Sequence, residues 1–354
     1  MLPGLYSYLE SAHGSRTGRL PGRSGLSTLS ASGAVREGEG GATALALPVV
    51  HGVRRTTRGE PVGADRTLAA LPGLVLIHGA FHTARCWAPT VGELARQVPD
   101  LKVLAVDLPG RGASPAELRE VTLRSCVDSV VEQIDRAGLG EVVVAAHSLG
   151  GLTAPVVVER LGPDRVARLV LIAAAVPPQG ATDLDLVAGR PLRWLMKRML
   201  PPGRIRQPPP RLLARACFCN GMTRAQRTLV YDQLCAEATN LYHEPVDRSG
   251  LPGTVPRTWI LPRRDRALPP RTQRSCMANL GRVDEVVEVD TCHDVMLSAP
   301  AMLATILAER CASGTVMAPS SAYPRPPARA PSASPTCTAP SRSSTGARTE
   351  SASR

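Results

Sequence analysis

The sequence predicts an α/β protein whose mostly parallel central sheet is flanked by helices, and three observations support this. Short β-rich runs alternate with amphipathic stretches between about residues 71 and 312. Most of these runs are nearly continuous in Val, Leu, Ile and Ala, which is typical of strands buried on both faces. The stretch at about 178–250 breaks the alternation and contains only helix-like patterns. We expect it to be a helical cap inserted into the sheet domain.

The elements follow one another in a regular order. Six runs are predicted as strands: 74–78, 103–107, 142–146, 169–173, 258–261 and 285–289. Helices are predicted at 89–98, 123–137, 149–161, 270–279 and 300–309. Several of them open with proline in the first turn, where the missing N–H costs nothing. Inside the cap, helical pieces are expected at 184–200, 211–219 and 224–240, with no strand.

The two ends of the chain differ in composition from its centre. Residues 1–70 and 313–354 are rich in Gly, Ser, Pro, Ala and Arg and lack apolar periodicity, which predicts disordered extensions. The apolar run 44–50 is the exception and is compatible with an extra edge strand. The remaining 71–312 is long enough for the core of one domain. Residues 1–20 have no secretory apolar region and no run reaches membrane-spanning length, so we expect a cytoplasmic protein without stable membrane insertion.

Charge and cysteine usage exclude several classes of partner and cofactor. The net charge is +12, and Lys102 and Lys197 are the only lysines, so arginine supplies nearly all positive charge. These arginines are scattered and form no stripe with interleaved aromatics, which favours solvated surface charge over a nucleic-acid partner. The nine cysteines form no C-x-x-C pair. Neither a zinc site nor a disulfide framework is therefore predicted, and free thiols suit a reducing compartment.

The strongest chemical signal is the segment 146–151, Ala-His-Ser-Leu-Gly-Gly, between a predicted buried strand and a predicted helix. A serine nucleophile in this position lies on a sharp, strained turn. The residues two before and two after it must therefore be small, and Ala146 and Gly150 meet this requirement around Ser148. The alternative interpretation is a strand-to-helix turn without catalysis.

A serine hydroxyl needs a base, and the base needs an acid to orient it. In a sheet protein with this turn, the order along the chain is Ser, acid, His. His293 follows the last predicted strand and Asp265 the one before it. Both should emerge at the carboxyl edge of the sheet together with Ser148. Asp290, three residues before His293, is the alternative acid.

Attack on an acyl carbon also requires donors for the oxyanion that forms. The segment 78–81, His-Gly-Ala-Phe, follows the first predicted strand. It is expected to present the backbone N–H of Ala80, with the N–H of Leu149 as the second donor. A simple glycine turn at this position is the alternative.

These segments resemble a known family. The runs 74–80 (Leu-Val-Leu-Ile-His-Gly-Ala), 107–112 (Asp-Leu-Pro-Gly-Arg-Gly), 147–151 and 293–297 resemble the α/β-hydrolase superfamily, and are most similar to its methylesterase and hydroxynitrile-lyase branch. The likeness covers roughly 71–309. It implies the α/β-hydrolase fold, a Ser-His-Asp triad at Ser148, Asp265 and His293, and a helical cap over an apolar pocket. It also implies no metal and no organic cofactor.

Two positions bear on the reaction. The lyases of this branch resemble one another in having threonine after the first-strand histidine and lysine after the catalytic one, whereas this chain has Gly79 and Asp294. Cyanohydrin cleavage is therefore disfavoured.

The predicted function is a serine esterase acting on a small-molecule ester. The alternatives are an acyltransferase or cofactor-free perhydrolase with the same triad, and a ligand receptor without turnover. The candidate pocket residues are Leu195, Met196, Met199, Leu200, Phe218, Leu229, Tyr231, Leu234 and Leu241.

Overall fold

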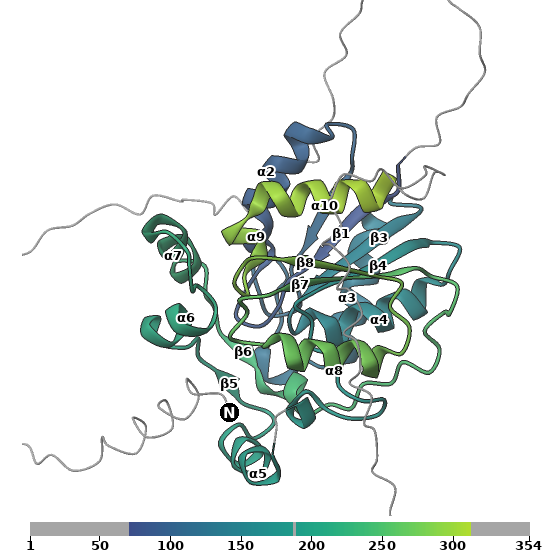
Figure 1. The fold of residues 1–354 in the computed structure, drawn as a ribbon. Helices are drawn as coiled ribbons and strands as arrows, with labels where there is room; N and C mark the ends of the chain where they lie inside the picture. The colour runs from purple at the N-terminus through teal and green to yellow at the C-terminus, as the bar shows by residue number, and fades with distance from the viewer. Residues whose placement is uncertain (1–70, 187–188, 313–354) are drawn as a thin grey trace, which may run out of the picture. The chain divides into compact units, whose positions relative to one another are not determined.

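A single parallel sheet forms the centre of the computed structural model, which describes residues 71–186 and 189–312 (Figure 1). Its order is β2-β1-β3-β4-β7-β8, and each neighbouring pair is parallel. The strands are β1 Gly73–Ile77, β2 Val103–Val106, β3 Val142–His147, β4 Val166–Ile172, β7 Arg257–Pro262 and β8 Glu285–Val289. All six predicted runs are strands, so the prediction of a mostly parallel sheet is confirmed.

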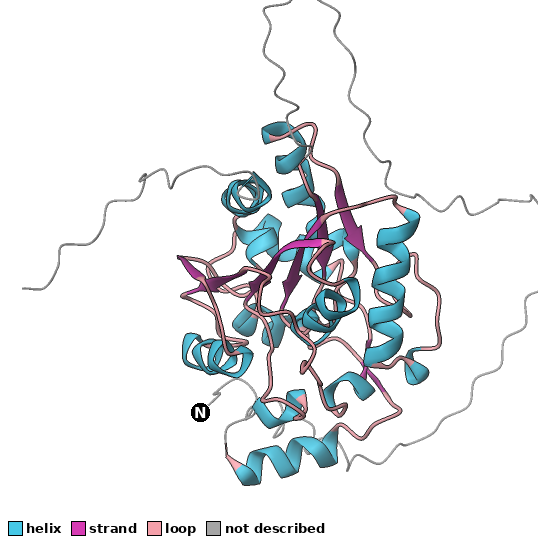
Figure 2. Ribbon diagram, turned by 90° about the vertical axis from the view of Figure 1, so that its right-hand side faces the viewer, coloured by secondary structure: helices cyan, strands magenta, loops and turns pink. Residues whose placement is uncertain are grey.

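Helices cover both faces of this sheet, as Figures 1 and 2 show. On one face lie α2 Ala88–Gln97, α9 Val295–Ser298 and α10 Pro300–Ala312. On the other lie α3 Leu123–Arg136, α4 Gly150–Leu161 and α8 Pro270–Leu280. Short 3-10 helices, η1 Ala84–Trp87 and η2 Leu118–Glu120, lie in the connections. The central strands β1, β3, β4 and β7 are therefore largely buried on both sides, as their apolar runs predict, whereas the edge strand β8 exposes Val286 and Glu288.

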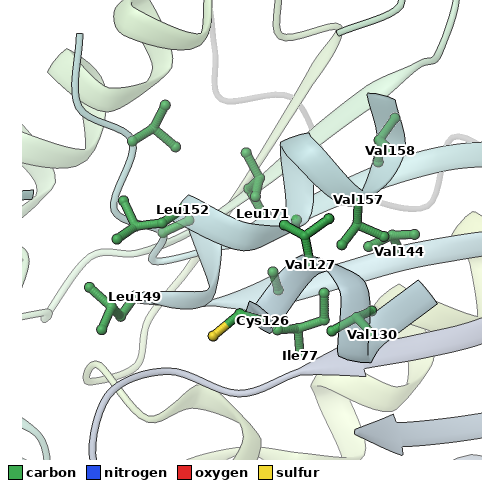
Figure 3. Packing of buried hydrophobic residues seen from close by; sticks show 14 of the residues in the cluster. Ile77, Cys126, Val127, Val130, Val144, Leu149, Leu152, Val157, Val158 and Leu171 are labelled. Carbon is green, nitrogen blue, oxygen red and sulfur yellow. The ribbon is translucent and has the colours of Figure 1, made fainter. Parts of the chain in front are cut away.

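The core divides into two layers because side chains alternate across each strand. Val75 and Ile77 pack on the α3 and α4 side, whereas Leu74 and Leu76 pack on the α2 and α10 side. Figure 3 shows the first layer, where neighbouring strands meet two helices. Its labelled members include Ile77, Val144 and Leu171 from the strands, and Cys126, Val127, Val130, Val157 and Val158 from α3 and α4.

The cap lies between β4 and β7 in sequence, although these strands are neighbours in the sheet. It contains η3 Asp183–Leu186, α5 Arg190–Met199, β5 Ile205–Arg206, α6 Arg211–Cys217, α7 Arg224–Tyr231, β6 Glu237–Ala238 and η4 Thr239–Tyr242. Strands β5 and β6 pair antiparallel as a separate small sheet. One anchor to the sheet domain is Glu244, whose Oε2 accepts the N–H of Leu123 at the start of α3 (2.8 Å).

Two expectations for the cap are wrong. The span 184–200 is not one helix, because Gly189, with φ +87°, precedes a new helix that has proline in its first turn. The expected helix over 224–240 ends at Tyr231, and the cap does contain strands. Residues 237–238 pair with 205–206, and such distant partners leave no trace in a local periodicity.

The predicted tails, with the run 44–50, lie outside the described residues. Their assignment and the domain boundaries stay predictions. Over 71–186 and 189–312, none of the helices combines the length and apolar character needed to cross a bilayer.

Candidate active site

Ser148 lies on a sharp turn between β3 and α4. Its φ is +50°, a left-handed conformation that a residue with a side chain rarely adopts. Hydrogen bonds hold the turn: the Ser148 N–H donates to the Ile172 carbonyl (3.0 Å), and the Ser148 carbonyl accepts from Gly151 (2.9 Å) and Ala175 (2.8 Å). The strained turn leaves the hydroxyl half-buried at the carboxyl end of β3.

Close packing around this turn explains the need for small residues. A Cβ on Gly150 would lie 2.8 Å from the His78 carbonyl oxygen. A Cβ on Gly79 would lie 2.7 Å from the Cβ of Ser148. Ala146 occupies the other flanking position and is fully buried in the core. Its methyl group is accommodated there, so this position needs a small residue but not glycine.

His293 connects Ser148 to a carboxylate. Its Nε2 lies 3.0 Å from the Ser148 Oγ, and its Nδ1 lies 2.7 Å from Asp265 Oδ2. With Nδ1 donating to the carboxylate, Nε2 is free to accept the hydroxyl proton. Burial lowers the pKa of His293, but the charge and hydrogen bond of Asp265 raise it more, with a further contribution from Asp294. The net result is a pKa above the usual 6.5.

Asp265 is held on both of its oxygens. Oδ1 accepts the N–H groups of Ala267 and Leu268, each at 2.8 Å. Oδ2 also accepts from the side-chain amide of Gln273 (3.0 Å), whose own oxygen accepts the Trp259 indole N–H (3.2 Å). The sequence interpretation missed Gln273: a helix was predicted at 270–279, but its pattern does not show which polar side chain faces the core.

The alternative acid lies elsewhere. The Asp290 side chain is 61 % exposed, and its Oδ1 lies 3.3 Å from Arg264 Nε and 3.7 Å from Arg263 Nη2. Asp265 and His293, by contrast, are only 4 % and 3 % exposed. The carboxylate that accepts the hydrogen bond from the His293 Nδ1–H is thus that of Asp265.

The two expected oxyanion donors belong to the two segments that adjoin Ser148. Ala80 follows Gly79 in the loop after β1, and Leu149 follows Ser148 at the start of α4. Within the described part of the chain, neither amide donates a hydrogen bond to a backbone carbonyl. A small cavity of about 10 Å³ adjoins both segments, and its lining includes Gly79, Leu149, Arg111, Glu237 and Leu241.

A buried polar layer lies behind His293. The Nε2–H of His147 donates to the His293 carbonyl (3.1 Å), and the two ring centroids are 4.7 Å apart. Burial and the nearby His293 lower the pKa of His147 to about 3, so this ring is neutral. Asp294 is fully buried, with Oδ1 3.5 Å from His82 Nε2. Burial raises the Asp294 pKa, but His82, His293 and His147 outweigh it, and the net pKa lies below its usual value.

Comparison with known proteins identifies the family. Residues 74–306 match the family model described as the alpha/beta hydrolase family. The chain belongs to this family. Among curated proteins, it is 35% identical over 135 residues to Esterase PIR7B from Oryza sativa subsp. japonica, covering 36% of this chain and 46% of that protein. It is 33% identical over 106 residues to Methylesterase 7 from Arabidopsis thaliana, covering 29% and 40%. The matches thus span less than half the length of these relatives.

Solved structures extend the similarity over a larger part of this alpha/beta hydrolase. An extracellular alpha/beta-hydrolase from a Paenibacillus species superimposes with a TM-score of 0.59 at 26% identity. That match covers 68% of this chain and 98% of the other. Together with the esterase relatives, it fits the methylesterase-like branch.

The cap of this alpha/beta hydrolase supplies only some of the expected pocket residues. Leu241 lines the cavity, and the ring of Phe218 lies 5.6 Å from that of His293. Met196 is buried in the core. Met199 and Leu229 are exposed, at 40% and 37%. Helical spacing alone did not distinguish residues near the site from residues of the core or of the exposed surface.

One group of described side chains could hold a metal ion. Potential ligand atoms of His147, His293 and Asp294 lie within 4.8 Å of one another. Both ring nitrogens of His293 already face Asp265 and Ser148. A metal at this position would have to break one of these contacts, so the group fits a metal poorly.

Proposed function

We propose that this alpha/beta hydrolase is a serine esterase that cleaves a small carboxylic ester through Ser148, His293 and Asp265. The observation that carries the proposal is the buried hydrogen-bond chain from Asp265 through His293 to the Ser148 hydroxyl, with contacts of 2.7 and 3.0 Å. This geometry matches the requirements of an activated serine nucleophile: a base within reach and an acid orienting that base.

In the proposed mechanism, the Ser148 oxygen attacks the ester carbonyl carbon while His293 Nε2 accepts the hydroxyl proton. The Ala80 and Leu149 amides stabilise the oxyanion of the tetrahedral intermediate. The intermediate collapses, and the alcohol leaves with the proton returned by His293. Water, deprotonated by the same Nε2, then hydrolyses the acyl-enzyme and regenerates Ser148. The Asp265 carboxylate stabilises the imidazolium in both steps.

The relatives support ester cleavage over the lyase reaction. Proteins named as an esterase and a methylesterase are among those most similar to this chain. Gly79 leaves no side-chain hydroxyl beside the nucleophile, and Asp294 places a buried carboxylate after His293. A carboxylate cannot assist the departure of cyanide as a lysine would.

A fluorophosphonate probe tests the proposal on the full chain. Wild type should be labelled and should hydrolyse short p-nitrophenyl esters, whereas Ser148→Ala should not be labelled and should lose at least about 10³-fold in kcat. Ser275→Ala, which removes an exposed hydroxyl on α8, is the matched control and should behave as wild type. Equal labelling of wild type and Ser148→Ala would refute the proposal. Product analysis with added alcohol or peroxide distinguishes hydrolysis from acyl transfer and perhydrolysis.

A further inference from the structure

The cap holds the loop that carries the proposed oxyanion donor Ala80. The next residue, Phe81, has φ +63°, and both of its backbone polar groups bond to one cap segment. Its N–H donates to Glu237 Oε2 (3.2 Å), and its carbonyl accepts the N–H of Cys235 (2.9 Å). A left-handed conformation in a residue with a side chain persists only when its surroundings impose it. Here those surroundings are residues 235–237.

Glu237 is itself fixed by two further contacts. Its Oε1 accepts the N–H of Ala238 (2.8 Å) and forms an ion pair with Arg111, which lies in the turn after β2. Both side chains of the pair are 1% exposed. Among the described residues, Glu237 is the one carboxylate that forms an ion pair with Arg111. Because each charge is buried, neither partner is free to leave the other for solvent.

The ion pair of Arg111 and Glu237 lines the same small cavity as Gly79 and Leu149, which are next to or part of the proposed oxyanion donors. The Glu237 carboxylate thus connects three parts of the molecule: the cap strand β6, the turn after β2, and the loop 79–81. A displacement of β6 would remove the acceptor of the Phe81 N–H and release the peptide next to Ala80.

We propose that Glu237 is a positioning residue that fixes the Ala80 amide for oxyanion stabilisation by holding Phe81. The oxyanion hole is then complete only while the cap segment 235–238 is docked on the sheet domain. This inference rests on the proposed esterase function and assigns the cap a part in the chemistry as well as in covering the pocket. Glu237 acts through the loop and does not touch the ester.

The test compares Glu237→Ala with a matched carboxylate of the same cap. Glu244 also accepts a backbone N–H of the sheet domain, at Leu123 far from Ser148. Glu244→Gln should keep kcat within about twofold of wild type. Glu237→Ala should lower kcat about 10- to 100-fold, with KM changed less than about threefold, because a displaced donor weakens binding of the transition state. The Ki of a trifluoromethyl ketone, which forms a tetrahedral adduct, should rise by the same factor.

A double variant separates positioning from stability. Glu237→Ala leaves Arg111 buried without its counter-ion, so its Tm should fall. Glu237→Ala with Arg111→Met removes that charge and should regain Tm but not kcat. Recovery of kcat together with Tm would overturn the proposal, as would a Glu237→Ala kcat equal to that of Glu244→Gln. If Glu237→Ala alone fails to fold, the kcat of the double variant tests the proposal instead.

Hydrogen exchange provides a readout that does not depend on turnover. Amides in segment 79–83 should exchange faster in the double variant than in Glu244→Gln, and equal rates would overturn the proposal that Glu237 holds this loop. If wild type shows no Ser148-dependent hydrolysis, the proposed esterase function fails, and the exchange rates alone decide whether Glu237 holds the loop.

Discussion

His293 lies between two carboxylates that affect it in different ways. Asp265 hydrogen-bonds to Nδ1 and sets the orientation of the ring. Asp294 forms no hydrogen bond to His293, but its buried charge still raises the pKa of the ring. The base must be neutral to accept the Ser148 proton, so kcat/KM should rise with pH through an apparent pKa above 6.5.

Replacing Asp294 with asparagine should move this pH profile. Removal of a negative charge that favours the imidazolium lowers the pKa of His293, so the acidic limb of kcat/KM should shift to lower pH. At high pH, where the base is already neutral, kcat/KM should change less than about threefold, since Asp265 still accepts the hydrogen bond of the His293 Nδ1–H. The measurement is kcat/KM for a p-nitrophenyl ester between about pH 5 and 9.

The control is Asp290→Asn, because the Asp290 side chain is exposed and paired with Arg264. Its acidic limb should stay where the wild-type limb lies. An Asp294→Asn profile that stays in place, or that moves to higher pH, contradicts the electrostatic assignment.

The sequence could predict that Ser148, Asp265 and His293 lie close together, because each follows a predicted strand and the carboxyl ends of parallel strands meet at one edge. The sequence did not predict the contact of Gln273 with Asp265, nor the burial of Asp294. Those depend on which way a helix or loop turns its polar side chains. A pattern of residue types does not carry that information for single positions.

At the scale of elements, the turn at Ser148 and the loop after β1 form one packed unit. The loop contacts Ser148 so closely that no side chain fits at position 79. Gly79→Ala should therefore push the loop away from Ser148 and lower kcat about 10- to 100-fold. Fluorophosphonate labelling of Ser148 should slow as well.

Gly92→Ala provides the comparison, since a Cβ at this position of α2 meets nothing within 4 Å. Alanine in a helix is favoured over glycine by about 0.5–1 kcal/mol, so this variant should be slightly more stable and equally active. Wild-type kcat in Gly79→Ala would show that the loop tolerates displacement.

The elements of the sheet domain were predictable and those of the cap only in part, for a physical reason. Strands β1, β3, β4 and β7 are buried on both faces, so their apolar runs are continuous. Strands β5 and β6 have two residues each, and they pair with each other although they lie roughly thirty residues apart in sequence. No periodicity develops over two residues, so they were missed.

At the scale of the molecule, the described residues 71–186 and 189–312 contain two layers of core. The hydrogen bonds of Ser148, Asp265 and His293 described above also lie there. A shortened chain of residues 71–312 should therefore fold, with kcat/KM within about twofold of the full chain and a single cooperative thermal transition. Insolubility, or a loss of more than about tenfold, would show that the predicted extensions contribute to the domain.

The insertion of the cap between neighbouring strands also has a consequence for how the protein folds. Residues 173–256 separate β4 from β7, yet Leu171 pairs with Trp259 across that boundary. Bringing the ends of so long a segment together costs more entropy than pairing β1 with β2 or β3 with β4, which lie closer in sequence. Ser148 precedes this junction, whereas Asp265 and His293 follow it. We therefore expect the nucleophile and its base to meet only after β4 has paired with β7, so the return of turnover during refolding should report this pairing.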